Sequence, residues 1–100
     1  MAVKVFIKRN VKKGKTQEAV ELLKEVRSYA LKQPGYISGE TLINHYDPCN
    51  ITVVSTWQTV EDWIRWEESD ERAANEEKLE GLLDKRTKFE VYDLGKSPDK

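Results

Sequence analysis

Apolar and polar residues alternate in four segments of the chain, and a period of two is typical of β-strands with one buried face. The first segment places Val3, Val5 and Ile7 on one side, opposite Lys4, Phe6 and Lys8. Along the whole chain, the same pattern predicts strands at residues 3–9, 36–46, 51–57 and 88–94.

Between the first two strands, apolar residues recur at spacings of three, four and seven, which marks an amphipathic helix. Thr16 is the predicted N-cap of this helix, and Pro34-Gly35 ends it. After the third strand, Gln58-Thr59 and Ser69-Asp70 each begin a helical segment, the second of which is expected to carry apolar residues as far as Leu83. The second helix is therefore predicted to be broken into two pieces.

The resulting order, β-α-β-β-α-β, predicts an α+β fold of ferredoxin-like topology, with a four-stranded antiparallel sheet and helices on one face. Residues 1–95 form one domain in this interpretation, and residues 96–100 are expected to be a flexible polar tail.

Both faces of the predicted sheet carry large apolar side chains, although the helices can cover only one face. One face is expected to hold Tyr36, Phe6, Leu42, Tyr46, Val54 and Tyr92, and the other Val3, Val5, Ile7, Ile37, Ile43, Ile51, Val53, Phe89 and Val91. Leaving the uncovered face in water forgoes about 1.5–3 kcal/mol for each large side chain that could be buried. The pattern therefore favours a homodimer through the open sheet face, a dimeric α+β barrel, over a monomer with scattered surface hydrophobics.

Charge and composition argue against a nucleic-acid-binding protein and against a membrane protein. With 17 basic and 18 acidic residues the net charge is −1, which argues against a nucleic-acid partner. No apolar run reaches the roughly 18 residues of a membrane span. The N-terminus enters alternating sequence without a signal-peptide core, and the single Cys49 fits a reducing compartment, so a cytoplasmic location is expected.

Two segments carry a family resemblance. The stretch 33–40, Gln-Pro-Gly-Tyr-Ile-Ser-Gly-Glu, is similar to the "PG…G" signature of the antibiotic biosynthesis monooxygenase family. The segment from Ser55 to Ser69, with Trp57, Trp63 and Trp66, resembles that family's third strand and second helix. The resemblance spans Val3 to Gly95. It implies a dimeric α+β barrel and oxygen chemistry on aromatic polyketides or quinols, with no metal or flavin cofactor.

The haem-degrading branch of that family does not match. By resemblance Trp66 falls on the branch's Trp position, but Asn75 falls where the haem-ligating His would stand and Ile7 near the position of the strand-one Asn. Haem iron would then have no protein anchor, so haem degradation is not expected. Other members carry His at the position of Trp66, so that candidate acid or base is also missing.

Aromatic and polar residues supply the pocket candidates. Trp57 and Trp63 are expected in the core. Trp66, at a position that the resemblance assigns to the pocket, is expected to form a flat wall for a planar substrate, with Trp63 three residues away as a second wall candidate. Arg9, Arg72 and Asn75 could supply the polar end, where an arginine would stabilise an enolate or phenolate oxygen. Alternatively, Arg72 only pairs with Glu68 or Glu76, one helical turn away.

His45 is the only histidine, and it is the candidate base for a phenol or quinol proton. Its place beside a turn also fits an ordinary surface histidine. His45, Asp47 and Cys49 straddle a tight turn without a fourth ligand, so no metal site is predicted. The acidic runs, including Glu76-Glu77, are interpreted as solvated surface.

The leading hypothesis is a cofactor-independent monooxygenase acting on a small aromatic or quinol substrate. Two alternatives stay open: a dimeric small-molecule binding or stress-related module without turnover, and an isomerase of small carbonyl compounds.

Overall fold

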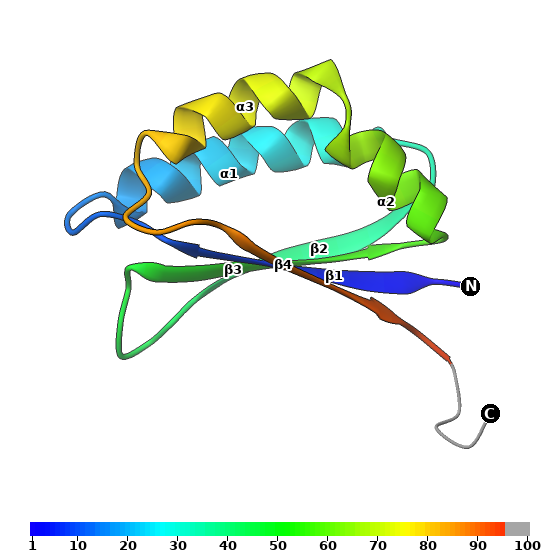
Figure 1. The fold of residues 1–100 in the computed structure, drawn as a ribbon, viewed down its shortest axis with the longest axis horizontal. Helices are drawn as coiled ribbons and strands as arrows, with labels where there is room; N and C mark the ends of the chain where they lie inside the picture. The colour runs from blue at the N-terminus through cyan, green and yellow to red at the C-terminus, as the bar shows by residue number, and fades with distance from the viewer. Residues whose placement is uncertain (96–100) are drawn as a thin grey trace.

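The computed structural model describes residues 1–95, which form a four-stranded antiparallel sheet with three helices on one face (Figure 1). The elements are β1 (Val3–Asn10), α1 (Thr16–Ala30), β2 (Tyr36–Ile43), β3 (Asn50–Trp57), α2 (Val60–Glu67), α3 (Asp70–Glu80) and β4 (Lys88–Asp93). The predicted ferredoxin-like arrangement and the broken second helix are confirmed. The predicted tail, residues 96–100, lies outside the described residues.

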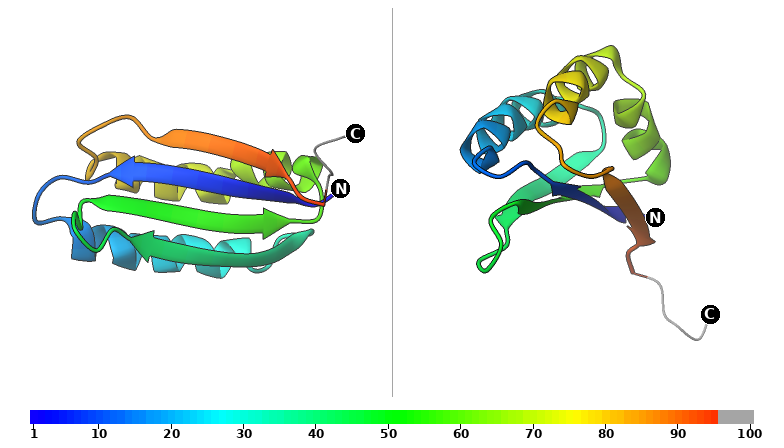
Figure 2. Two further views of the ribbon diagram at one scale, coloured as in Figure 1. Left: turned by 90° about the horizontal axis from the view of Figure 1, so that it is seen from below. Right: turned by 60° about the vertical axis from the view of Figure 1, so that its left-hand side comes forward.

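The strand order is β2-β3-β1-β4, and every neighbouring pair is antiparallel. The first strand is therefore central, with Val5 opposite Ser55 on one side and Val91 on the other. Figure 2, left, looks onto the uncovered face, with β4 and β2 at the two edges.

The core lies between the sheet and the helices. One cluster gathers Val3, Val5, Ile7, Ala30, Trp57, Trp63 and Trp66, and a second gathers Val11, Ala19, Leu23, Ile51, Leu79 and Leu82. Each large side chain that is fully buried contributes about 1.5–3 kcal/mol of transfer free energy. The alternation of β1 determines which of its residues enter this core, because successive side chains point to opposite faces.

Two of the three predicted caps are confirmed. The Thr59 and Ser69 hydroxyls accept hydrogen bonds from the backbone N–H groups of Asp62 and Arg72, at the starts of α2 and α3. The cap predicted at Thr16 is wrong, because α1 begins at Thr16 itself and Lys15 takes the N-cap position. The Thr16 hydroxyl instead donates to the Pro48 carbonyl at 2.9 Å, and this bond ties the helix to the β2–β3 hairpin.

The predictions for β2 and α3 need correction at their ends. The second strand stops at Ile43 rather than Tyr46, because the Asn44 side chain accepts the backbone N–H groups of Tyr46 and Asp47 and forms a turn. Tyr46 therefore lies in the hairpin and is 93% exposed. The last helix ends at Glu80, before the apolar residues predicted to continue it.

An irregularity in β2 changes the face on which Tyr36 lies. The register shifts between Tyr36 and Ser38, so Tyr36 pairs with Trp57 on the helix-covered side. A bulge of this kind adds one residue and reverses the alternation. The predicted placement of Tyr36 on the uncovered face, in dimer packing, is therefore wrong.

Apolar side chains remain on the uncovered face, as predicted. Phe6 and Tyr92 contact edge to face, with ring centroids 5.5 Å apart, and Leu42 and Tyr92 are about half exposed. Lys8 and Glu90 form an ion pair at 3.1 Å beside them. Within residues 1–95, no helix is long and apolar enough to cross a membrane.

Gly35 joins α1 to β2 at the point where α2 packs. Its φ of 82° lies in the left-handed region, and a Cβ there would overlap the Asp62 side chain. Its carbonyl accepts the Gln58 backbone N–H at 2.7 Å. The Asp62 carboxylate also accepts a hydrogen bond from the Thr59 hydroxyl and forms an ion pair with Arg65. Both interactions lower the pKa of Asp62, and the hydrogen bond from Thr59 has the larger effect. Gly35 thus allows α2 to approach the sheet.

Replacement of Gly35 by alanine is expected to lower the free energy of unfolding by about 2–4 kcal/mol, because backbone strain and the overlap with Asp62 add together. Gly14→Ala is the matched control: its φ is also 82°, but nothing lies within 4 Å of the added Cβ. The control should lose only about 1–2 kcal/mol. Urea unfolding followed by tryptophan fluorescence measures both, and equal losses would contradict the proposed close approach.

Candidate functional site

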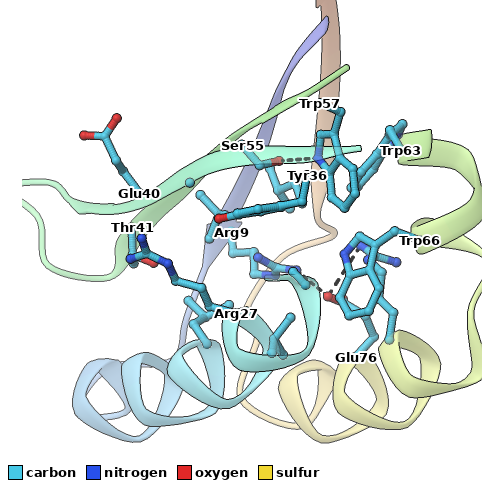
Figure 3. A pocket seen from close by; sticks show the side chains of 17 residues that line it. Arg9, Arg27, Tyr36, Glu40, Thr41, Ser55, Trp57, Trp63, Trp66 and Glu76 are labelled. Atoms are coloured by element: carbon cyan, nitrogen blue, oxygen red, sulfur yellow. Dashed lines mark hydrogen bonds and ion pairs between the residues drawn. The ribbon is translucent and has the colours of Figure 1, made fainter. Parts of the chain in front are cut away.

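A cavity of about 50 Å³ lies between the helix-covered face of the sheet and the helices (Figure 3). Its lining comes from all three helices and from β1, β2 and β3: Ile7, Arg9, Leu23, Val26, Arg27, Ala30, Tyr36, Gly39, Glu40, Thr41, Val53, Ser55, Trp57, Trp63, Trp66, Arg72 and Glu76. An engineered apolar cavity that binds benzene measures about 150 Å³, and one water needs roughly 10–15 Å³. The present cavity therefore has room for a few waters, and an aromatic ring would require side chains to move.

Four aromatic side chains form one wall of the cavity. Tyr36 meets Trp57 edge to face at 5.2 Å, and Trp57 lies 6.1 Å from Trp63, both measured between ring centroids. Trp66 lines the same space from α2. The indole N–H of Trp57 donates to the Ser55 hydroxyl at 3.0 Å, which satisfies the buried donor.

Gly39 makes room for the Tyr36 side chain. A Cβ at Gly39 would overlap the Tyr36 hydroxyl, which therefore lies directly over the backbone of its own strand. The bulge turns Tyr36 toward the helices, and Gly39 lets its ring lie along the strand toward the cavity.

The polar end of the cavity is an ionic cluster of two arginines and one glutamate. Arg9 from β1 is 3% exposed and Arg72 from α3 is 7% exposed. Arg9 Nη2 donates to Glu76 Oε1, and Arg72 Nη2 lies 3.5 Å from the same oxygen. Figure 3 shows dashed lines meeting at Glu76 from the arginines. One carboxylate therefore serves two buried guanidinium groups.

The two arginines have more donors than the cluster satisfies. Within residues 1–95, Arg9 Nε, Arg9 Nη1 and Arg72 Nη2 have no hydrogen-bond partner. Burial lowers the pKa of Arg9, Glu76 opposes that shift, and the neighbouring charge of Arg72 lowers the pKa further. Arginine nevertheless keeps its charge in proteins, so the cluster has one more positive than negative charge.

Arg72 is held by aromatic faces as well as by Glu76. Its guanidinium carbon lies 5.5 Å from the Trp63 ring centroid and 5.6 Å from that of Phe89. A cation over an aromatic face is attracted by the ring quadrupole. The arrangement positions Arg72 between the internal cavity and a surface depression that is lined by α3, the segment 83–87 and the start of β4.

Two charged side chains lie at the outer side of the cavity. Arg27 on α1 and Glu40 on β2 are both exposed, and Figure 3 shows Glu40 directed away from the aromatic wall. They are opposite in charge and in contact with solvent. The excess positive charge therefore belongs to the buried cluster.

The structure brings together four of the six predicted site residues: Arg9, Trp63, Trp66 and Arg72 all line the cavity. His45 does not; it is exposed in the β2–β3 hairpin and packs edge to face with Tyr46 at 5.0 Å. Asn75 is buried, but its side-chain N–H donates to the Glu71 carbonyl of its own helix at 2.9 Å, and it does not line the cavity.

Glu76, Tyr36 and Ser55 are polar lining residues that were not among the site predictions. The spacing of Arg72 and Glu76 indicated a helical ion pair, but it gave no sign that the pair is buried. The interpretation of Glu76 as solvated surface is wrong, since its side chain is 16% exposed and contacts two buried arginines. Among the described residues, no group of three or more His, Cys, Asp or Glu side chains is placed to hold a metal ion.

The fold and the cavity define a ferredoxin-like α+β protein with a partly buried aromatic pocket between its sheet and helices. A family model described as antibiotic biosynthesis monooxygenase matches residues 2–78. The chain belongs to this family, and the resemblance seen in the sequence is confirmed. Comparison with curated proteins gave no significant match.

Solved structures support the same fold. A conserved protein from Methanosarcina mazei Go1 is 27% identical, with a TM-score of 0.86 over 92% of this chain and 91% of that one. SnoaB, a cofactor-independent oxygenase from Streptomyces nogalater, is 12% identical, with a TM-score of 0.85 over 99% and 98% of the two chains. Rv0793 from Mycobacterium tuberculosis is 10% identical, with a TM-score of 0.86 over 98% and 99%.

Glu76→Gln is expected to lower the free energy of unfolding by about 1–3 kcal/mol, because two buried guanidinium groups lose their shared counter-charge. Glu77→Gln, an exposed neighbour on the same helix, should change it by no more than about 0.5 kcal/mol. Urea unfolding of both variants at one protein concentration checks the difference. If Glu76→Gln did not lower the free energy of unfolding, or lowered it no more than Glu77→Gln does, the buried cluster would not stabilise the fold.

Proposed function

We propose that this protein is a cofactor-independent oxygenase that acts on a small planar aromatic substrate, a quinol or related phenol. The observation that carries the proposal is the pairing of an aromatic wall with two buried arginines in one cavity. Membership of a monooxygenase-type family and the fold shared with a cofactor-independent oxygenase support it.

The aromatic wall suits a planar substrate. Trp57, Trp63 and Trp66 offer large, rigid apolar surfaces, and stacked or edge-to-face aromatic pairs add about 0.5–1.5 kcal/mol beyond simple burial. At its inner end, between sheet and helices, the cavity is lined by buried residues, which limits water there and strengthens electrostatic interactions.

The two arginines can stabilise the phenolate form of the substrate, which is the form that reacts with O₂. A guanidinium beside a phenol lowers the pKa of that hydroxyl by stabilising the anion, and the proton can be released as the substrate binds. The resulting phenolate is electron-rich and can donate electrons to O₂. Arg9 and Arg72 would hold the oxyanion, and no role is assigned to His45 in this cavity.

The reaction balances without an external reductant. For a quinol, C₆H₆O₂ and O₂ give the hydroxyquinone C₆H₄O₃ and H₂O: one oxygen atom forms a new C–O bond and the other leaves as water. The substrate supplies all four electrons that reduce O₂. This stoichiometry distinguishes an oxygenase from an oxidase, which would release H₂O₂.

A binding module without turnover is the second candidate. The observation in its favour is that, within residues 1–95, the cavity lining contains no histidine, and its buried carboxylate is already occupied by two arginines. Such a module would bind the same planar ligands and would be stabilised by them without forming product.

Oxygen uptake by the purified protein, supplied with a panel of hydroquinones and anthrones, is expected to exceed autoxidation. Trp66→Ala should reduce the enzymatic rate roughly 10- to 100-fold because the substrate loses its positioning wall. Trp66→Phe, which keeps an aromatic face, should retain a larger part of the rate. Ile64→Ala, an exposed change on the same helix, is the control. No uptake above autoxidation with any substrate would favour the binding module, and full activity in both Trp66 variants would exclude this cavity as the site.

We also propose that the protein is a homodimer through the uncovered sheet face. The support is the apolar group of Phe6, Leu42, Val54 and Tyr92 on that face, of which Leu42 and Tyr92 are about half exposed. Two such faces related by a twofold axis would bury one self-complementary surface.

Sedimentation at micromolar concentration is expected to give a dimer. Leu42→Lys should shift the equilibrium toward monomer because it places like charges at the proposed interface. Leu31→Lys, at a similarly exposed leucine after α1, serves as control and should remain dimeric. A wild-type monomer, or a Leu42→Lys dimer of unchanged affinity, would contradict this interface.

A further inference from the structure

The ionic cluster at the polar end of the cavity has two buried guanidinium groups and only one carboxylate. Arg9 and Arg72 come from different elements, β1 and α3, yet both depend on the single carboxylate of Glu76. Within residues 1–95, three of their nitrogen atoms have no hydrogen-bond partner. Buried donors without partners are costly, so native proteins usually satisfy them. Here a further acceptor can be accommodated.

The charges facing the cavity indicate what that acceptor carries. The positive groups are Arg9, Arg27 and Arg72, and the negative groups are Glu40 and Glu76. Arg27 and Glu40 are exposed and of opposite sign, so solvent screens both. The buried set has one excess positive charge. An ionised ligand oxygen would be attracted by this excess and, where it displaced Glu76, would take over as the counter-charge of the two arginines; a neutral ligand would do neither.

Glu76 has a second environment available. Its side chain borders both the internal cavity and the surface depression along α3 and the segment leading to β4. The other charged residues that line this depression, apart from Arg72, are Glu67, Glu80, Asp84, Lys85 and Arg86. A carboxylate that turned toward this depression would gain contact with solvent, and hydration rather than the mixed charges of the lining would stabilise it there. The movement would also enlarge a cavity that now measures about 50 Å³.

We propose that Glu76 is an internal anion occupying a ligand site, and that the substrate binds as a planar monoanion whose ionised oxygen replaces Glu76 on Arg9 and Arg72. The inference rests on the proposed function only in taking the aromatic cavity as the ligand site. It narrows the substrate class to aromatic or quinonoid compounds with one acidic oxygen, such as an ionised hydroxyquinone.

Two matched probes test the charge requirement. 2-Hydroxy-1,4-naphthoquinone is an anion at neutral pH, and 2-methoxy-1,4-naphthoquinone is a neutral analogue of nearly the same shape. Calorimetric titration of the wild-type protein is expected to show the anion binding about tenfold more tightly or better, the size expected when hydrogen bonds to charged groups distinguish two ligands. Equal affinities, or no binding of either probe, would overturn the proposal.

Replacement of Glu76 gives the sharper result. If Glu76 competes with the ligand, its removal strengthens binding, whereas removal of a residue that supports the pocket weakens binding. Glu76→Gln removes the competing carboxylate and should strengthen binding of the anionic probe by roughly threefold or more, with little change for the neutral probe. A residue that merely supported the pocket would weaken both probes on replacement, and that result would overturn the proposal. Glu77→Gln is the control on the exposed side of the same helix and should bind both probes as the wild type does.

Replacement of Arg9 tests whether this arginine binds the ionised oxygen of the ligand. Arg9→Gln should abolish the preference for the anion, and Arg65→Gln, an exposed arginine on α2, should leave it intact. If thermal unfolding shows that Arg9→Gln does not fold, Arg9→Lys replaces it. Lysine keeps the charge but lacks the fork of donors, so a reduced preference is expected. Wild-type preference in the folded variant would overturn the proposal.

The binding data separate this inference from the proposed reaction. A preference for the anion that is strengthened in Glu76→Gln, without oxygen uptake for any substrate, would refute the oxygenase and support the anion site. Oxygen uptake together with equal affinity for both naphthoquinones would support the oxygenase and refute the anion site.

Discussion

The alternation of β1 forces a charge into the core, and much of the site depends on this constraint. Val3, Val5 and Ile7 must face the helices to form the core, and Arg9 follows them with the same period. A guanidinium in that position needs a counter-charge, which Glu76 supplies from α3. The cluster thus links the central strand to the last helix.

A buried ion cluster of this kind is a poor way to gain stability, since three apolar residues of similar size would avoid the desolvation of three charged groups. Its position beside four aromatic side chains is easier to understand as part of a binding site. The unpartnered donors of Arg9 and Arg72 and the nearby aromatic wall occupy one small cavity. Perturbed charged groups in an enclosed pocket are a general mark of functional sites.

The two faces of the sheet serve different purposes. The helix-covered face forms the core and encloses the cavity, while the uncovered face keeps an apolar group centred on the Phe6 and Tyr92 rings. The same strand, β1, contributes to both faces because its side chains alternate. Association through the uncovered face would therefore also restrain the strand that carries Arg9.

Periodicity in the sequence determined the order of elements, the break between α2 and α3 and the inward face of β1, because these follow from local spacing and capping at Thr59 and Ser69. The aromatic and arginine candidates were also visible, and Arg9, Trp63, Trp66 and Arg72 do meet in space. Tertiary structure alone decided the rest. Tyr36 reaches the cavity through a bulge that alternation cannot reveal, and His45 and Asn75 are kept from it by a hairpin turn and by a bond within α3. Glu76 looked like a surface charge because its burial depends on Arg9, 67 positions away in the chain, and local sequence holds no information about a partner so distant.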